Sequence, residues 1–254
     1  MPFVTHMMIF RYDPLKKNMD IIKGGKKGSD AKVAVGIVGL GGLGAMGIKL
    51  AKALGCSVTA ISRSDAKKAY ALNDCGADTF IASADTSQMK AGVKSVDIIL
   101  NTIPSYHDYT AYTPLLSTRP GAKQILLGLH KGLAGAMVAD QIRGGKSRVG
   151  MSGIGGIRAT QEVMDLCAQN DIKPDIKVCP VEEINEIYSR LDAGNSSHVR
   201  YVLDIAGSLK EDELDDAIRR CQGKAAPKLS PFSGGISPLA AVSECCWLIC
   251  CCKT

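Results

Sequence analysis

An apolar segment that runs directly into a glycine-rich turn is the feature that most constrains how this chain can fold. Residues 33–38 are mostly apolar, and they are followed by Gly39, Leu40, Gly41, Gly42, Leu43 and Gly44. This G-x-G-x-x-G spacing allows a sharp turn, close approach of a pyrophosphate and tight packing of the next helix on the strand. That helix, predicted over residues 43–54, would direct its free amide groups and positive dipole end at the phosphates. The pattern predicts a dinucleotide-binding turn; the alternative is a turn with a structural role only.

Beyond this turn, β-branched segments alternate with helical patterns, as in a doubly wound parallel sheet. Strands are predicted over residues 33–38, 57–61, 79–82, 96–101, 123–128 and 148–152. Helices are predicted over residues 43–54, 65–74, 107–117, 135–142 and 156–169. The sequence therefore predicts an α/β fold, a six-stranded Rossmann sheet. A strand over 176–179, a helix over 182–193 and a strand over 199–205 are expected to follow it.

The composition divides the chain into four expected parts. Residues 1–32 carry seven Lys or Arg and three Asp, so they hold +4 of the net charge of +6, which is typical of a basic, solvated linker or a remnant of another domain. Residues 33–173 form the expected NADP-binding Rossmann domain, and 174–208 a remnant of a second domain. A charged helix, a linker and a cysteine-rich tail are expected in residues 209–254.

Composition also limits the classes of partner and the compartment. Only 5% of the residues are aromatic, which argues against base-stacking surfaces, so no nucleic-acid partner is expected. No segment approaches the roughly 20 apolar residues of a membrane span, and no secretory signal is evident, so a cytoplasmic protein is expected. The cysteines at 245–252 leave three alternatives open: acylation that would bring the protein to a membrane, soft-metal binding, or no selected role.

The end of the second predicted strand indicates which dinucleotide is bound. NAD-binding units place a carboxylate there for the ribose hydroxyls, whereas this chain has Ser62, Arg63 and Ser64, with Lys67 nearby. A guanidinium, an ammonium and two hydroxyls suit a 2′-phosphate. The sequence therefore favours NADP(H), with ordinary surface charges as the alternative for Arg63 and Lys67.

Six motifs, in order, resemble the cinnamyl-alcohol-dehydrogenase-like branch of the zinc-dependent medium-chain dehydrogenases. They occupy residues 36–44, 75–78, 101–104, 127–129, 152–162 and 200–204. The resemblance covers about residues 33–208, with a weaker match over Tyr12–Lys16. It implies NADP(H)-dependent interconversion of alcohols and aldehydes, and a homodimer joined through the sixth strand, 148–152.

The resemblance also implies roles for particular residues. Ser62, Arg63, Ser64 and Lys67 would hold the 2′-phosphate, and Arg200 would lie near the cofactor. The residues implied to line the ribose and nicotinamide are Thr102, Ile103, Pro104, Gly128, Leu129, Ser152, Gly153 and Ile154. For Ile103, Leu129 and Ile154 a core position is the alternative.

One departure from the family concerns its zinc, which an N-terminal catalytic domain holds. Only about 32 residues precede the first strand here, none of them Cys, and His6, His107, His130 and His198 stand singly. No zinc site and no catalytic residue are therefore expected in this chain, which is expected to be inactive alone. A non-catalytic NADPH-binding or dimerising regulatory protein, or a truncated gene product, is the alternative.

The strands near 176–179 and 199–205 are expected either to expose apolar surface or to pair locally.

Overall fold

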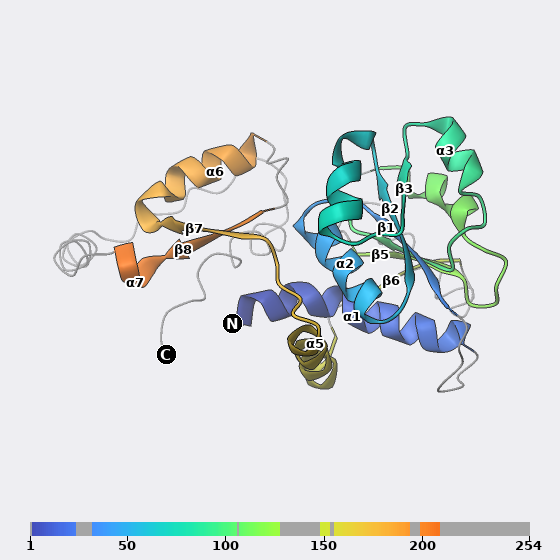
Figure 1. Cartoon of the computed structure of the whole chain (residues 1–254), viewed down its shortest axis with the longest axis horizontal. Helices are drawn as coiled ribbons and strands as arrows, with labels where there is room; N and C mark the ends of the chain where they lie inside the picture. Colours follow the sequence, from blue (N-terminus) through green and yellow to red (C-terminus); the bar gives the residue numbers. More distant parts are fainter. Residues whose placement is uncertain are drawn as a thin grey trace, which may run out of the picture. The chain divides into compact units, whose positions relative to one another are not determined.

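The structure, a computed structural model, describes residues 2–23, 32–105, 107–127, 148–152, 155–193 and 199–208 (Figure 1). The chain divides into two units. The first comprises Met1–Asp175 with Ser196–Arg200, and the second comprises Ile176–Asn195 with Tyr201–Thr254. The predicted helix over 135–142 and the predicted part 209–254 lie outside the described residues.

A six-stranded sheet forms the centre of the first unit. Its strands are β1 (Ala34–Val38), β2 (Ser57–Ser62), β3 (Thr79–Ala82), β4 (Ile98–Asn101), β5 (Lys123–Leu126) and β6 (Val149–Met151). All neighbouring strands pair in parallel, in the order β3-β2-β1-β4-β5-β6. The strand order reverses between β1 and β4, which is the Rossmann arrangement. The predicted α/β fold with six parallel strands is confirmed.

The connections between the strands differ in part from the predicted α-helices. Helices α2 (Gly42–Ala53) and α5 (Ile157–Gln169) form where they are predicted. The segment 65–74 instead forms the 3₁₀ turn η1 (Asp65–Lys67) and the π-turn η2 (Tyr70–Asp74). The segment 107–117 forms the 3₁₀ helix η3 (Tyr109–Leu115), which contains Pro114. Proline has no N–H group to donate within a helix, which explains why a regular α-helix does not form there.

One short helix was not expected from the sequence. Helix α3 (Thr86–Ala91) begins after Asp85, whose carboxylate accepts hydrogen bonds from the backbone N–H groups of Ser87 at 2.8 Å and Gln88 at 3.2 Å. This side-chain cap satisfies amide groups that a helix start leaves unpaired. The helix is too short for its periodicity to stand out in the sequence.

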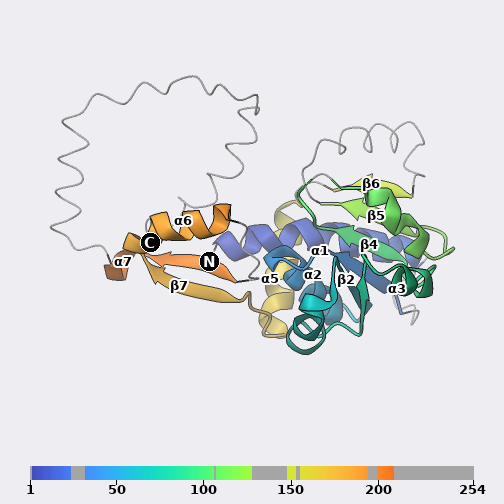
Figure 2. The same ribbon diagram turned by 90° about the horizontal axis from the view of Figure 1, so that it is seen from above.

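Helices cover both faces of the sheet and bury its apolar side chains. On one face, Leu15 of helix α1 (Pro2–Ile22) and Ile48 of α2 pack with Ile37, Val58 and Leu100 of the strands. On the other face, side chains from α3 and η3 pack on β1, β2 and β4. Helices α1, α2 and α5 also pack on one another (Figures 1 and 2). The strand ends are thereby held at fixed positions along one edge.

The N-terminal segment is the main correction to the sequence-based expectation. Residues 2–22 do not form a solvated linker; they form α1, in which Tyr12, Leu15 and Met19 are buried. These side chains recur at helical spacing and pack on the sheet, while the basic residues pair at its surface: Lys16 with Glu162 at 2.5 Å and Lys17 with Asp13 at 2.7 Å. The high density of charge obscured this apolar stripe. None of the helices in the described ranges is long and apolar enough to cross a membrane.

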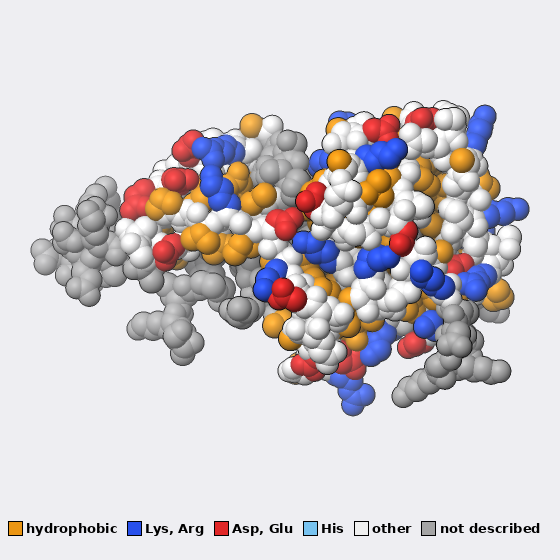
Figure 3. Space-filling model, in the orientation of Figure 1, with side chains coloured by type: hydrophobic (Ala, Val, Ile, Leu, Met, Phe, Trp, Pro, Cys, Tyr) orange, Lys and Arg blue, Asp and Glu red, His pale blue; other side chains and the backbone are white. Residues whose placement is uncertain are grey.

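The second unit contains a small sheet with short helices. Strand β7 (Ile176–Pro180) lies beside β8 (Arg200–Asp204), and η4 (Val181–Glu183), α6 (Ile184–Asp192) and α7 (Ile205–Ser208) accompany them. Ile176, Val178 and Val202 are 52%, 58% and 39% exposed, and hydrophobic side chains are visible at the surface over β7 (Figure 3). The expected local pairing and the expected exposed apolar surface both occur.

The burial of α1 leads to a stability prediction. Leu15→Ala should lower the free energy of unfolding by about 2–5 kcal/mol, because Leu15 is fully buried and truncation leaves a cavity. Urea unfolding of the full chain measures this. Lys17→Ala is the control on the same helix, since Lys17 is 70% exposed and its loss should change stability by about 0.5 kcal/mol or less. Equal effects of the two substitutions would show that α1 does not belong to the core.

Candidate functional site

The carboxyl ends of the parallel strands bring most of the predicted site residues to one edge of the sheet. Val38 at the end of β1 pairs with Ile61 of β2 and with Asn101 of β4. The same register continues through β5 to Met151 of β6. Ligands of open α/β sheets bind outside this edge, where the strand order reverses.

Three glycines of the predicted turn differ in their surroundings. Gly39 has a φ of +93°, which favours glycine. An ideal Cβ on Gly44 would lie 1.8 Å from the carbonyl oxygen of Gly39, so a side chain there would separate α2 from β1. Around Gly41, by contrast, no atom of the described residues lies within 4 Å of a Cβ. The exposed backbone of Gly41 is open to an incoming group.

The start of α2 leaves helical amide groups available. Gly41 is the residue that precedes the helix, with extended backbone, and no side chain from the described parts of the chain caps it. The first amide groups of an α-helix have no partner inside the helix, and the helix dipole makes this end positive. Leu40, Gly42 and Leu43 continue the backbone around this end. The arrangement suits an anion such as a phosphate.

Thr102 and Asn101 support the turn from the neighbouring strand. The Thr102 hydroxyl donates to the carbonyl oxygens of Val38 at 2.8 Å and Gly39 at 3.1 Å. The Asn101 carboxamide accepts a hydrogen bond from the backbone N–H of Ile103 at 3.2 Å and lies 2.8 Å from a ring nitrogen of His107. These contacts hold residues 101–104, including Pro104, beside the glycine turn.

The residues predicted to hold a 2′-phosphate lie at the end of β2 and directly after it, as expected. Arg63 and Ser64 are exposed, and Ser62 and Lys67 are partly exposed. The backbone carbonyl oxygens of Ser62 and Arg63 accept hydrogen bonds from Ser83 at 2.7 Å and Ala84 at 3.1 Å, which fixes the backbone while the Arg63 side chain stays at the surface.

Lys67 connects this segment to the glycine turn. Its ammonium group donates a hydrogen bond of 2.9 Å to the carbonyl oxygen of Leu40. The end of β2 and the start of α2 are therefore neighbours, as a site for one dinucleotide requires.

Arg200 lies beside the glycine turn although it comes late in the sequence. An ideal Cβ on Gly42 would lie 2.8 Å from Arg200 Nε and 3.0 Å from its Cζ. The backbone N–H of Arg200 donates to the carbonyl oxygen of Asp175 at 2.8 Å, which fixes the strand start. Burial lowers the pKa of the Arg200 guanidinium, and its Nε is buried without a hydrogen-bond partner among the described residues.

Two side chains near this edge were missed by the sequence analysis. Arg11 of α1 is only 2% exposed and lies along α2, where an ideal Cβ on Gly47 would be 3.4 Å from Arg11 Cδ. Burial, and to a smaller extent the charge of Arg200, lowers the pKa of Arg11 to about 9. The other is His107, which contacts Asn101. Neither belongs to a spaced motif, so the sequence contained no signal for them.

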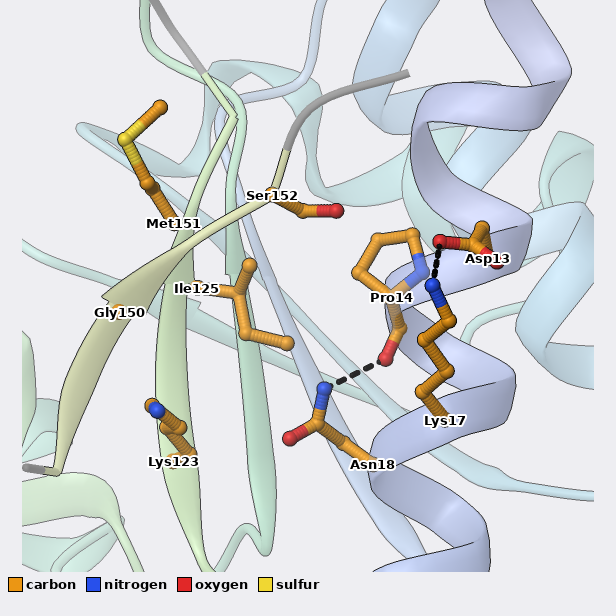
Figure 4. A pocket seen from close by; sticks show the side chains of 9 residues that line it. All are labelled: Asp13, Pro14, Lys17, Asn18, Lys123, Ile125, Gly150, Met151 and Ser152. Carbon is orange, nitrogen blue, oxygen red and sulfur yellow. Dashed lines mark hydrogen bonds and ion pairs between the residues drawn. The ribbon is translucent and has the colours of Figure 1, made fainter. Parts of the chain in front are cut away.

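A separate pocket of about 280 Å³ lies between α1 and the strands β5 and β6 (Figure 4). Ser152, which was predicted for the nicotinamide end, lies in its wall opposite Pro14, and Lys17, Asn18 and Lys123 line its polar part. The remaining predicted residues of this end, Gly128, Leu129, Gly153 and Ile154, lie outside the described residues.

The described residues do not form a metal centre. No three His, Cys, Asp or Glu side chains within the described ranges come together in a way that could hold a metal ion. The four described cysteines, Cys56, Cys75, Cys167 and Cys179, are buried free thiols.

Comparison with known proteins identifies a family that the sequence of this chain matches. The sequence pattern described as "Zinc-binding dehydrogenase" matches residues 42–169, about half of the chain. A "Probable cinnamyl alcohol dehydrogenase" of Lolium perenne is 36% identical over 201 residues, which are 79% of this chain and 52% of that protein.

Two solved structures agree with this match. A cinnamyl alcohol dehydrogenase from Sorghum bicolor superimposes with a TM-score of 0.64 and 31% identity, over 81% of this chain and 55% of that one. The Helicobacter pylori enzyme CAD, complexed with NADP(H), has a TM-score of 0.62 and 30% identity, over 80% of this chain and 54% of that one. The chain therefore spans about half the length of the relatives that it matches.

The surroundings of Gly44 and Gly41 predict opposite effects of an added methyl group on stability. Gly44→Ala should lower the free energy of unfolding by about 3 kcal/mol or more, because the new methyl group would overlap the Gly39 carbonyl oxygen. Gly41→Ala should cost about 1 kcal/mol or less, since the space is open and only the helix start is affected. Chemical denaturation of both variants measures the difference. A fully stable Gly44→Ala variant would contradict the observed packing of α2 on β1.

Proposed function

The chain belongs to the zinc-binding dehydrogenase family, in its cinnamyl-alcohol-dehydrogenase-like branch, and on this premise we propose that it is the NADP(H)-binding part of an alcohol dehydrogenase-like oxidoreductase. The observation that carries the proposal is the glycine turn. Gly41 is open, the start of α2 is uncapped by any described side chain, and Arg200 lies against Gly42. These features suit a bound pyrophosphate.

In the proposed complex, each end of the cofactor meets side chains suited to its charge. The pyrophosphate lies at the start of α2, where backbone amides and the Arg200 guanidinium donate to its oxygens. Ser62, Arg63, Ser64 and Lys67 hold the 2′-phosphate. Support for this assignment comes from the exposed Arg63 side chain and from Lys67, whose ammonium group already lies at Leu40 of the turn.

The nicotinamide end is proposed to follow β4 and β6. Thr102, Ile103 and Pro104 line the ribose and nicotinamide, and Ser152 lies at the end of β6. When bound, NADPH supplies a hydride for reduction of an aldehyde to an alcohol. The chain's own residues hold and orient the dinucleotide. The alcohol and aldehyde substrate class is proposed from the relatives, and a homodimer through β6 is proposed from the family resemblance.

A second candidate is a non-catalytic, dimerising or regulatory NADPH-binding protein. The exposed apolar side chains Ile176, Val178 and Val202 favour it, because exposed apolar side chains are typical of interaction sites. Both candidates use the same cofactor site and differ in turnover. Oxidation of NADPH by the purified chain with an aromatic aldehyde, with and without added zinc, would support the first candidate; tight binding without turnover would support the second.

Charge reversal at Arg63 tests the choice of cofactor. Arg63→Asp should weaken NADPH binding by about 2 kcal/mol or more, since it replaces a charge-assisted phosphate contact by a repulsion, and should change NADH binding much less. Calorimetric titration of both cofactors measures this. Lys90→Asp in α3, an exposed position with the same change of charge, is the control and should leave both affinities unchanged. An unaltered NADPH affinity in Arg63→Asp would refute the role at the 2′-phosphate.

A substitution at Gly41 tests the pyrophosphate position. Gly41→Val should abolish measurable binding of both NADPH and NADH, because the side chain would occupy the open space at the start of α2. The unfolding free energy should change by only about 1 kcal/mol, as the backbone there is extended. A folded Gly41→Val variant with wild-type affinity would show that the turn is not the binding site.

A further inference from the structure

We propose that Asp175 is a positioning residue for the bound dinucleotide, which holds Arg200 beside the start of α2. It does so by joining the first residue of β8 to Lys49 of α2 and to Tyr70 of η2. The inference rests on the proposed function and adds to it three residues outside all six motifs of the sequence. All four residues belong to the first unit.

The side chain of Asp175 is bound by two separate elements. Its Oδ1 accepts a hydrogen bond of 3.2 Å from Lys49 Nζ of α2, and its Oδ2 accepts one of 2.6 Å from the Tyr70 hydroxyl of η2. Lys49 Nζ also donates to the backbone carbonyl oxygen of Lys173 at 3.1 Å. Burial first, and then the hydrogen bond to Asp175, raises the pKa of Tyr70, so its hydroxyl remains a donor near neutral pH. The backbone at residues 173–175 is thereby tied to α2.

The backbone of Asp175 in turn holds Arg200. The carbonyl oxygen of Asp175 accepts a hydrogen bond from the backbone N–H of Arg200 at 2.8 Å. The Arg200 guanidinium lies against Gly42, where an ideal Cβ would be 2.8 Å from Nε and 3.0 Å from Cζ and Nη2. Nε has no hydrogen-bond partner among the described residues. No hydrogen bond at Nε therefore fixes the side chain, and the backbone anchor at Asp175 contributes to its position.

Helix α2 sets the spacing of these contacts. Gly42 and Lys49 are seven residues apart, close to two turns, so they lie on the same face of the helix and about 10 Å apart along its axis. Arg200 packs at the first of these positions, and Asp175 binds the second. The helix whose free amides are proposed to bind the pyrophosphate therefore also locates the guanidinium beside them.

The charge of Asp175 separates positioning from simple electrostatics. A negative charge near a bound pyrophosphate opposes its binding, so removal of the carboxylate without any positioning effect should strengthen binding or leave it unchanged. If the carboxylate holds Arg200 in place, its removal should instead weaken binding. The effect should depend on the pyrophosphate and be independent of the 2′-phosphate, which Arg63 and Lys67 are proposed to hold at the other end.

The experiment titrates the full chain with three probes: NADPH, NADH and 2′-AMP, which carries the 2′-phosphate without the pyrophosphate. Asp175→Ala removes the contacts to Lys49 and Tyr70 and leaves the backbone carbonyl in place. It should weaken NADPH and NADH by the same factor, about tenfold, because the arginine that bonds the pyrophosphate is no longer held, and should leave 2′-AMP unchanged. Asp175→Asn, which keeps an acceptor at the same place, should restore most of the loss.

Asp78→Ala is the matched control. Asp78 pairs with Lys52 of the same helix at 2.7 Å, and its side chain is 36% exposed, close to the 38% of Asp175. The substitution therefore makes the same change of charge and also breaks an ion pair to α2. It should leave all three affinities unchanged. A loss for both dinucleotides as large as in Asp175→Ala would overturn the proposal.

A double variant tests whether Asp175 acts through Arg200. In an Arg200→Met background, Asp175→Ala should have no further effect on NADPH or NADH, because the guanidinium that it positions is absent. A purely structural role would lower the unfolding free energy and leave the affinities of the folded protein unchanged. That result, an equal loss in both backgrounds, or an equal loss for all three probes would refute the positioning role. If the wild-type chain binds neither dinucleotide, the proposed function itself fails, which is a distinguishable outcome.

Tyr70→Phe covers the case in which Asp175→Ala does not fold. It deletes one oxygen atom without a change of charge and removes the hydrogen bond to Asp175. Both dinucleotides should bind about threefold more weakly, with 2′-AMP unaffected. Wild-type affinities for the dinucleotides in this variant would contradict the role of Asp175.

Discussion

The approach of Gly44 to the carbonyl oxygen of Gly39 is the contact on which the rest of the site depends. A Cβ at Gly44 would lie 1.8 Å from that oxygen, so α2 can begin directly against the end of β1 only if this residue is glycine. Thr102 of the neighbouring strand ties the same turn through its hydroxyl. The start of α2 is thereby held at the point where the strand order reverses, and its free amide groups face outward.

Positive charge from distant parts of the chain gathers around this point. Lys67 reaches the turn from the segment after β2 and Arg200 from the start of β8, while Arg11 of α1 lies further along α2, beside Gly47. Burial lowers the pKa of both arginines. Positive side chains near the start of a helix suit the binding of an anion.

Comparison with relatives shows the family of this chain, whereas its activity is a proposal. Its sequence pattern and its sheet order belong to the zinc-binding dehydrogenases, and it spans about half the length of its relatives. The proposed cofactor site lies within one unit, whose glycine turn, strand ends and arginines are all present. The apolar side chains exposed on β7 and β8 belong to the other unit and suit a protein surface. Fold and ancestry do not by themselves specify chemistry, which depends on the groups at the site.

The sequence by itself determined the parallel sheet, the position of the glycine turn, and the serine that ends β2 with the arginine that follows it. These follow from local patterns: β-branched segments, a fixed glycine spacing and the residue types beside it. It did not reveal that residues 2–22 form a helix, because Lys16 and Lys17 obscured a stripe of only Tyr12, Leu15 and Met19. Nor did it reveal that 65–74 and 107–117 adopt 3₁₀ and π turns. The tertiary structure alone decided that Arg200 lies against Gly42 and Arg11 along Gly47, since these positions depend on the packing of α1 on α2 and on the path of the chain back to the sheet edge, which no local pattern encodes.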